Sequence, residues 1–262
     1  MFGTRLRARY VGIASLALIV AAWCFYWYAR TPRATDEMGG YALAERLGCH
    51  GCHGPRGSGG IPNPGSKELE VPSWDGGAPM MYAESEAELS EWILDGVPRR
   101  LAHERGHAHD HAVGRTSLPI HMPAYRQVLE EGEIDLLVSY VKAVALWDTI
   151  PEAALSGRRA AARLGCFGCH GPGGMIGMPN PMSFKGYIPP WRGTDFRELV
   201  RDEAELRSWI LDGGIARFES NPVARFFTRR QVIKMPAYRD VVTEEELDDI
   251  VAYIEELSRK GG

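Results

Sequence analysis

Apolar residues recur at helical spacing in four segments of the chain. Spacings of i, i+3 and i+4 place side chains on one face of a helix, whereas alternation predicts a strand. The four segments are residues 89–93, 134–141, 206–210 and 247–254. No alternating stretch stands out, so we predict an all-α fold. The 30 Gly and 17 Pro residues indicate long loops between short helices.

The N-terminal segment has a different pattern. Residues 10–29 carry no charge, and a run of about 20 apolar residues crosses the hydrocarbon core of a bilayer. Arg5, Arg7 and Arg9 precede this run, which by the positive-inside rule leaves the N-terminus in the cytoplasm. We predict one transmembrane helix within residues 1–33. The alternative is a cleaved signal peptide, but bulky aromatic residues stand where small residues should mark a cleavage site.

The rest of the chain is a tandem repeat. Arg-Leu-Gly-Cys-x-Gly-Cys-His-Gly-Pro occupies residues 46–55 and returns 117 residues later at 163–172. Met-Pro-Ala-Tyr-Arg begins at Met122 and returns at Met235. Two copies of one structural unit follow from this self-similarity. We therefore predict two domains, residues 34–149 and 150–262.

Each repeat contains the pattern Cys-x-x-Cys-His, which attaches c-type haem. Two thiols three positions apart reach the two vinyl groups of one porphyrin, and the next imidazole then lies beneath the iron. The thiols are those of Cys49, Cys52, Cys166 and Cys169, and the imidazoles are His53 and His170. The fifth cysteine, Cys24, lies in the apolar N-terminal segment, so no disulfide framework is expected. The predicted cofactors are two haem c groups.

The sixth iron ligand must come from another part of each repeat. Met122 and Met235 stand in identical pentapeptides, 69 and 65 residues after His53 and His170. A thioether ligand raises the potential of a His-ligated haem and closes the iron to substrate. We predict these methionines as axial ligands. His121 is the rival ligand in the first repeat, where the second repeat has Lys234.

Further residues are expected around each haem. The other ring nitrogen of the proximal histidine needs an acceptor, and we expect a backbone carbonyl near Pro62 and Pro64, or near Pro179 and Pro181. Trp74 and Trp191 occupy equivalent positions. Two interpretations of these tryptophans stay open, because a buried indole N–H seeks a partner. They donate to haem propionates, or they pack in the core.

Each repeat resembles a class I cytochrome c domain over about residues 36–262. The resemblance rests on Cys-x-x-Cys-His near the start, a late Met and an amphipathic closing helix with Tyr140 or Tyr253. It implies a small all-α haem domain with one exposed haem edge. The chain has Asn-Pro in place of the family's Gly-Pro-x-Leu-x-Gly turn.

Charge divides the chain unevenly. Residues 34–149 hold 9 basic and 18 acidic residues, while residues 150–262 hold 16 of each. No domain is basic, which argues against a nucleic-acid partner, and the acidic repeat suits a basic soluble electron carrier. The loop before Met122 carries four histidines, and clustered imidazoles are one way to bind zinc or copper. They are His103, His107, His109 and His111. A solvated polar loop is the alternative.

These features predict an electron-transfer protein rather than an enzyme. The expected setting is a bacterial inner membrane with single-pass anchoring and the haem domains in the periplasm. The expected partners are integral membrane subunits of a redox complex, of the bc type or linked to an oxidase. The alternative is a dihaem enzyme such as a peroxidase or a thiosulfate dehydrogenase. A catalytic haem needs an open or displaceable sixth position, whereas both repeats offer methionine.

Overall fold

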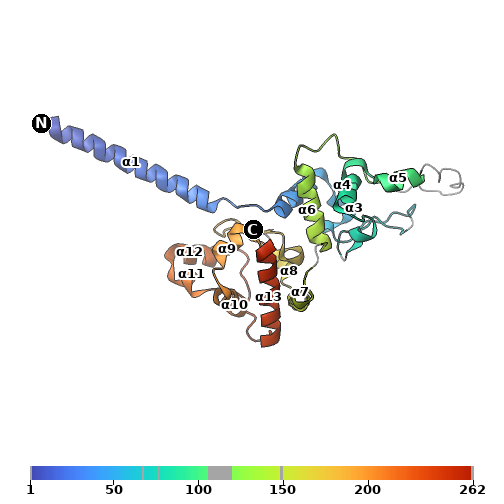
Figure 1. Cartoon of the computed structure of the whole chain (residues 1–262). Coiled ribbons are helices and arrows are strands. Elements are labelled where there is room, and N and C mark those ends of the chain that lie inside the picture. The colour runs from blue at the N-terminus through green and yellow to red at the C-terminus, as the bar shows by residue number, and fades with distance from the viewer. Residues whose placement is uncertain (1, 67, 76, 106–119, 148–149, 261–262) are drawn as a thin grey trace.

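The computed structural model describes residues 2–66, 68–75, 77–105, 120–147 and 150–260. It begins with a long helix, α1 (Phe2–Arg30), which projects away from the remaining helices (Figure 1). The C-terminal end of this helix and the residues just after it contact the second repeat. Arg30 donates from Nε to the Phe184 carbonyl (2.8 Å), and the Arg33 backbone N–H donates to Asp195 (2.9 Å).

The structure contradicts the predicted transmembrane span over residues 10–29. In the part of the chain that it describes, no helix combines the length and the apolar character needed to cross a membrane.

The first repeat is built from short helices. They are α2 (Asp36–Leu47), α3 (His50–His53), η1 (Pro55–Gly57), η2 (Ala78–Met81), α4 (Glu86–Asp95), α5 (Arg99–Arg105) and α6 (Glu133–Ala145). The predicted apolar faces lie on α4 and α6, where Leu89, Ile93 and Leu137 are buried. Ser85 caps α4 by accepting from the Glu88 N–H, and the Glu88 carboxylate accepts from the N–H of Glu84, the residue before the cap, in a bond that resembles a capping box.

The second repeat follows the same order and adds elements. They are α7 (Glu152–Arg163), α8 (Phe167–His170), η3 (Pro172–Gly174), β1 (Met178–Pro179), β2 (Tyr187–Ile188), α9 (Gly193–Leu199), α10 (Glu203–Asp212), α11 (Ala216–Ser220), α12 (Pro222–Arg230) and α13 (Glu244–Lys260). The antiparallel pair β1–β2 departs from the all-α prediction. Two residues per strand are too few to show as alternation in the sequence, so the hairpin could not be read from the pattern.

In each repeat the first and last helices cross closely. A Cβ on Gly40 in α2 would lie 2.0 Å from the Leu136 carbonyl oxygen of α6. A Cβ on Gly157 in α7 would likewise lie 1.8 Å from the Asp249 carbonyl oxygen of α13. Glycine is required at both crossings, because any larger residue would push the backbones apart.

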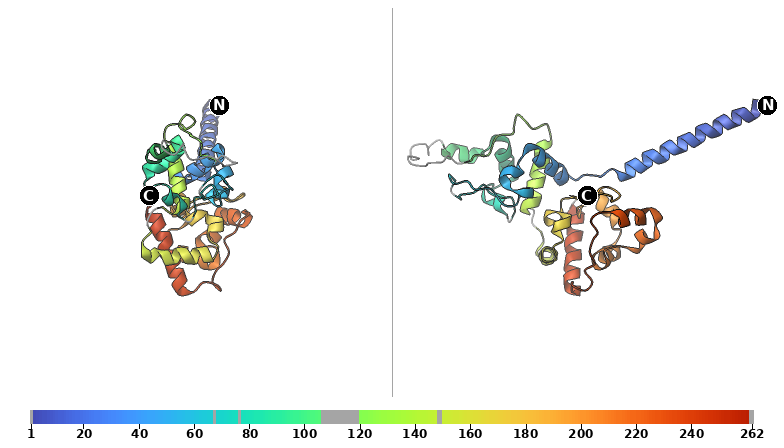
Figure 2. Two further views of the ribbon diagram at one scale, coloured as in Figure 1. Left: turned by 90° about the vertical axis from the view of Figure 1, so that its right-hand side faces the viewer. Right: turned by 180° about the vertical axis from the view of Figure 1, so that it is seen from behind.

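Two apolar cores result, one per repeat, and they touch. The first gathers residues of α2, α4 and α6, and the second gathers residues of α7, α10 and α13. Ile176 of the second repeat packs into the first core, and Ala143 of the first repeat packs into the second. A part-buried ion pair between Arg192 and Glu37 (2.6 Å) joins the repeats as well. Figure 2 shows the two groups of helices side by side.

Candidate haem sites

The two Cys-x-x-Cys-His motifs lie on matching short helices. Cys49 and Cys166 each precede a four-residue helix, α3 or α8, that contains the second cysteine and the histidine. All four cysteines are half-buried and free of disulfide bonds. Burial raises the pKa of the Cys49 and Cys166 thiols above the usual range. Each motif thus presents two thiols and one imidazole from a single turn.

The proximal histidines are oriented by a carbonyl that the sequence did not reveal. His53 donates from Nδ1 to the Pro72 carbonyl oxygen at 2.7 Å. In the second repeat Nδ1 of His170 is buried and has no hydrogen-bond partner among the described residues, although the Pro189 carbonyl acts to raise the pKa of this imidazole against the effect of burial. Pro72 and Pro189 are 117 residues apart, so the expectation of an acceptor near Pro62, Pro64, Pro179 or Pro181 is wrong.

Burial keeps both imidazoles neutral. Desolvation lowers the pKa of His53, and it lowers the pKa of the more deeply buried His170 to about 4. A neutral imidazole has a free lone pair on Nε2, which is the form that ligates a metal. The local environment therefore suits a histidine that binds iron through Nε2 while Nδ1 faces a carbonyl.

Both tryptophans singled out in the sequence pack against the proximal histidines. The Trp74 ring stacks on His53 with centroids 4.7 Å apart, and the Trp191 ring lies 4.9 Å from His170. Their close approach depends on small neighbours, because a Cβ on Gly57 or Gly174 would strike the indole at 2.4 or 2.1 Å. Trp74 is 8% and Trp191 4% exposed. Both indole rings therefore cover one face of the proximal histidine of their repeat.

The two Met-Pro-Ala-Tyr-Arg segments dock onto the ends of α4 and α10. The Tyr125 N–H donates to the Ile93 carbonyl and the Tyr238 N–H to the Ile210 carbonyl, each at 3.1 Å. A Cβ on Gly96 would lie 2.4 Å from the Met122 carbonyl oxygen. Gly213 has the same relation to Met235, also at 2.4 Å. The Met-Pro-Ala-Tyr-Arg segment of each repeat thus packs against the Leu-Asp-Gly sequence at the end of α4 or α10.

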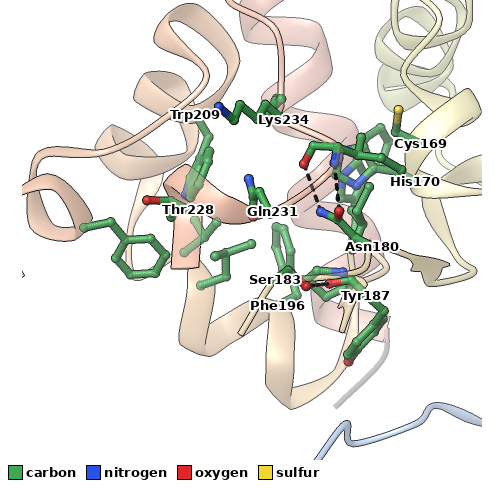
Figure 3. Close-up of a pocket in the computed structure, with 18 of the residues that line it drawn as sticks. Cys169, His170, Asn180, Ser183, Tyr187, Phe196, Trp209, Thr228, Gln231 and Lys234 are labelled. Carbon is green, nitrogen blue, oxygen red and sulfur yellow. Dashed lines mark hydrogen bonds between the residues drawn. The ribbon is translucent and has the colours of Figure 1, made fainter. Parts of the chain in front are cut away.

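A buried asparagine fixes the chain two residues before each methionine. Asn63 donates from Nδ2 to the Ile120 carbonyl (3.0 Å), and its Oδ1 accepts from the Ile120 N–H (2.8 Å). Asn180 makes the same pair with Ile233 at 2.9 and 2.9 Å, shown as dashed lines in Figure 3. In the sequence the repeated Asn-Pro stands out only as a departure from the family turn. Recurrence at the common offset was the signal for this role.

The rival ligand in the first repeat lies in a less suitable place. His121 is exposed, whereas Met122 is partly buried and packs against the first core. Adjacent residues in an extended segment point in opposite directions. The contacts of Met122 therefore favour the thioether over the neighbouring imidazole.

The second repeat encloses a cavity of about 450 Å³. Its wall includes both thiols, His170, Met235 and Asn180. Figure 3 shows Cys169 and His170 on one side of this space and Trp209 with Thr228 on the other. The volume falls within the range of sites for small organic ligands. The structure therefore brings the motif and the late methionine, 65 residues apart in sequence, to one cavity.

The donor set of this cavity fits a covalently bound haem. Two thiols and a neutral imidazole line the same mainly apolar space as a thioether, which together are the groups that hold haem c. Buried Nε1 of Trp209 has no hydrogen-bond partner among the residues that the structure describes, as expected of a cavity built around a group with polar substituents.

The predicted histidine cluster falls mostly outside the described residues. His107, His109 and His111 belong to that part of the chain, and only the backbone of His103, on α5, is described. Among the residues that the structure does describe, no group of three or more His, Cys, Asp or Glu side chains is arranged to hold a metal ion.

One family matches the chain, over residues 152–254, and it is described as cytochrome C oxidase, cbb3-type, subunit III. This range runs from the start of α7 into α13 and contains Cys166, Cys169, His170 and Met235. The second repeat is therefore a c-type cytochrome domain, the type of domain that binds haem c and transfers electrons. Comparison with curated proteins and with solved structures gave no match.

Proposed function

We propose that the chain is a dihaem c-type cytochrome that transfers electrons outside the cytoplasm. In this proposal Cys49 and Cys52 hold one haem and Cys166 and Cys169 hold the other. The observation that carries it is the cavity shared by Cys166, Cys169, His170 and Met235. The first repeat supports a second haem, because the contacts of Asn63, Trp74 and Tyr125 recur at the equivalent residues Asn180, Trp191 and Tyr238.

The proposed axial ligands are His53 with Met122, and His170 with Met235. When bound, the haems supply one-electron chemistry at iron. The residues of the chain bind and orient them: His53 is held by its bond to the Pro72 carbonyl, and each methionine segment is held by the end of a helix and a buried asparagine.

The proposed partners are subunits of a membrane redox complex and, at the first repeat, a basic soluble carrier. The two haem-attachment motifs and the charge of −9 on residues 34–149 support this assignment. Extracytoplasmic haem domains facing such a complex suit a protein of a respiratory or photosynthetic chain, in the periplasm of a bacterium.

Haem stoichiometry tests the proposal directly. Pyridine haemochrome analysis against protein mass should give two haems per chain. Cys52→Ala and Cys169→Ala should each remove one covalent haem, and because the two substitutions are equivalent each serves as the control for the other. A wild-type ratio of one would show that only one repeat binds haem.

Ligation is tested separately from attachment. Met235→Ala and Met122→Ala should each remove half of the weak sulfur-to-iron absorption band and lower one reduction potential. His121→Ala is the matched control and should change neither quantity. If His121→Ala lowers a potential and Met122→Ala does not, the first haem has two histidine ligands. Carbon monoxide binding to either ferrous haem would favour the enzyme alternative.

A further inference from the structure

The cavity of the second repeat contains a polar group that the protein leaves without a partner. Trp209, on α10, is 9% exposed and lines the cavity. Its Nε1–H is buried and has no hydrogen-bond acceptor in the described part of the chain. A buried donor without an acceptor costs free energy, so such a group in a ligand cavity indicates an acceptor on the ligand.

In the first repeat the equivalent tryptophan donates its indole N–H to a backbone carbonyl of the protein. Trp92 is its equivalent 117 residues earlier, and Nε1 of Trp92 donates to the Tyr82 carbonyl at 3.1 Å. In the second repeat Leu199 takes the place of Tyr82, and its carbonyl accepts from Nη2 of Arg217 at 3.0 Å. The Leu199 carbonyl, which is equivalent to that of Tyr82, therefore accepts a hydrogen bond from Arg217 instead of from Trp209. The indole of Trp209 lines the cavity.

The location of Trp209 indicates which part of a haem it would meet. The thiols bind the vinyl-bearing edge of a porphyrin, and the two propionates leave from the opposite edge. Figure 3 shows Trp209 across the cavity from Cys169. Trp191 lies against the ring of His170 instead, 4.9 Å away between centroids. Trp209 is thus better placed than Trp191 to reach a carboxylate at the far edge.

The neighbours of Trp209 suit an anionic group as well. The side chains of Gln231 and Lys234 line the same cavity, and both can donate hydrogen bonds. Among the carboxylates of the cavity wall, Asp195 is engaged by Lys185, Tyr187 and the Arg33 backbone. A propionate at the Trp209 side would meet donors there.

We propose that Nε1–H of Trp209 donates a hydrogen bond to a propionate of the haem bound by the second repeat. The inference rests on the proposed function, because it requires haem at Cys166 and Cys169. A donor to the propionate offsets negative charge near the iron, and this raises the reduction potential by making the ferrous state less unfavourable. Since Trp92 is engaged with Tyr82, the first haem lacks the equivalent bond. The two haems therefore differ in potential by a built-in feature of the second repeat.

The test compares Trp209→Phe with the matched variant Trp92→Phe in the full-length holoprotein. Phenylalanine keeps a packed aromatic ring and loses the N–H. Trp209→Phe should lower the potential of one haem and shift the propionate bending mode in the resonance Raman spectrum. Trp92→Phe should leave the potentials and the Raman mode unchanged. Haem content should stay at two in both variants.

A measurement on the wild type covers the case in which a variant fails to fold. In the reduced, diamagnetic protein an indole N–H should show a nuclear Overhauser effect to propionate methylene protons and should exchange slowly with deuterium. Unchanged potentials and an unchanged Raman mode in Trp209→Phe at full haem content would overturn the inference, as would absence of the Overhauser effect. Absence of covalent haem from the second repeat of the wild type would instead overturn the proposed function.

Discussion

Gly40→Ala should destabilise the first repeat although alanine is the better helix former. The added Cβ would lie 2.0 Å from the Leu136 carbonyl oxygen and 2.6 Å from the Tyr140 Cβ. Ordinary contact needs at least 3.4 Å, so α2 and α6 must separate by about 1.4 Å. The carbonyl is part of the α6 backbone and cannot rotate away as a side chain would.

Two opposing effects set the magnitude. Alanine in place of glycine favours a helix by about 1 kcal/mol. Overpacking of a close-packed interface costs about 1–3 kcal/mol, and a backbone clash lies at the upper end of that range. We expect a net loss of about 2 kcal/mol in the free energy of unfolding, or about 8 °C in the Tm of a domain of roughly 100 residues.

Gly39→Ala is the matched control on the same helix. Its Cβ would meet only the flexible side chain of Leu136, at 3.3 Å from Cδ1. This variant should keep wild-type stability or gain up to about 1 kcal/mol. Urea denaturation of the holoproteins, followed by circular dichroism and by the haem absorption band, measures both changes. Equal stabilities for the two variants would refute the close crossing of α2 and α6.

Three further predictions follow from other contacts. Asn180→Leu removes both hydrogen bonds to the Ile233 backbone. It should weaken the sulfur-to-iron absorption band of the second haem at unchanged haem content. A band of full strength would show that the asparagine does not position the methionine. The Arg217 guanidinium lowers the pKa of Glu205 to about 2. The ion pair therefore stabilises the folded state fully above pH 4.5, the ordinary pKa of a glutamate, and this contribution is lost as the pH falls from 4.5 to 2. Glu205→Gln should therefore cost about 1–2 kcal/mol at pH 7 and little near pH 2 in urea titrations, and an equal cost at both pH values would contradict the ion pair. Glu130 and Glu131 are exposed, and their joint replacement by Gln should slow electron transfer with a basic carrier, most strongly at low salt; a rate that does not respond to ionic strength would argue for a permanently bound partner.

The sequence by itself determined the repeat, the local elements and the chemistry of the motifs. The i, i+3, i+4 spacing of apolar residues predicted helices that the structure places at α4, α6, α10 and α13. The offset of 117 indicated in advance which residues of the two copies should be equivalent. These features follow from neighbours along the chain, because helical periodicity and motif spacing are local properties.

Only the tertiary structure decided which groups meet. The sequence pointed to Pro62 or Pro64 for the histidine acceptor, but the chain path brings the Pro72 carbonyl to His53. A carbonyl belongs to every residue, so residue type gives no signal for this bond. The predicted membrane span is also wrong, because a run without charges does not by itself give a helix of the length and apolar character that a bilayer requires, and no helix of the described residues has both.

The roles of Asn180 and Trp209 also depend on the tertiary structure. Each is one of many polar or aromatic residues in the sequence, and each gains its role from what the fold places beside it. Asn180 meets the backbone of Ile233, 53 residues away, and Trp209 loses the acceptor that Trp92 keeps. Hydrogen bonds between distant segments depend on the positions of both partners, and only the folded chain fixes those positions.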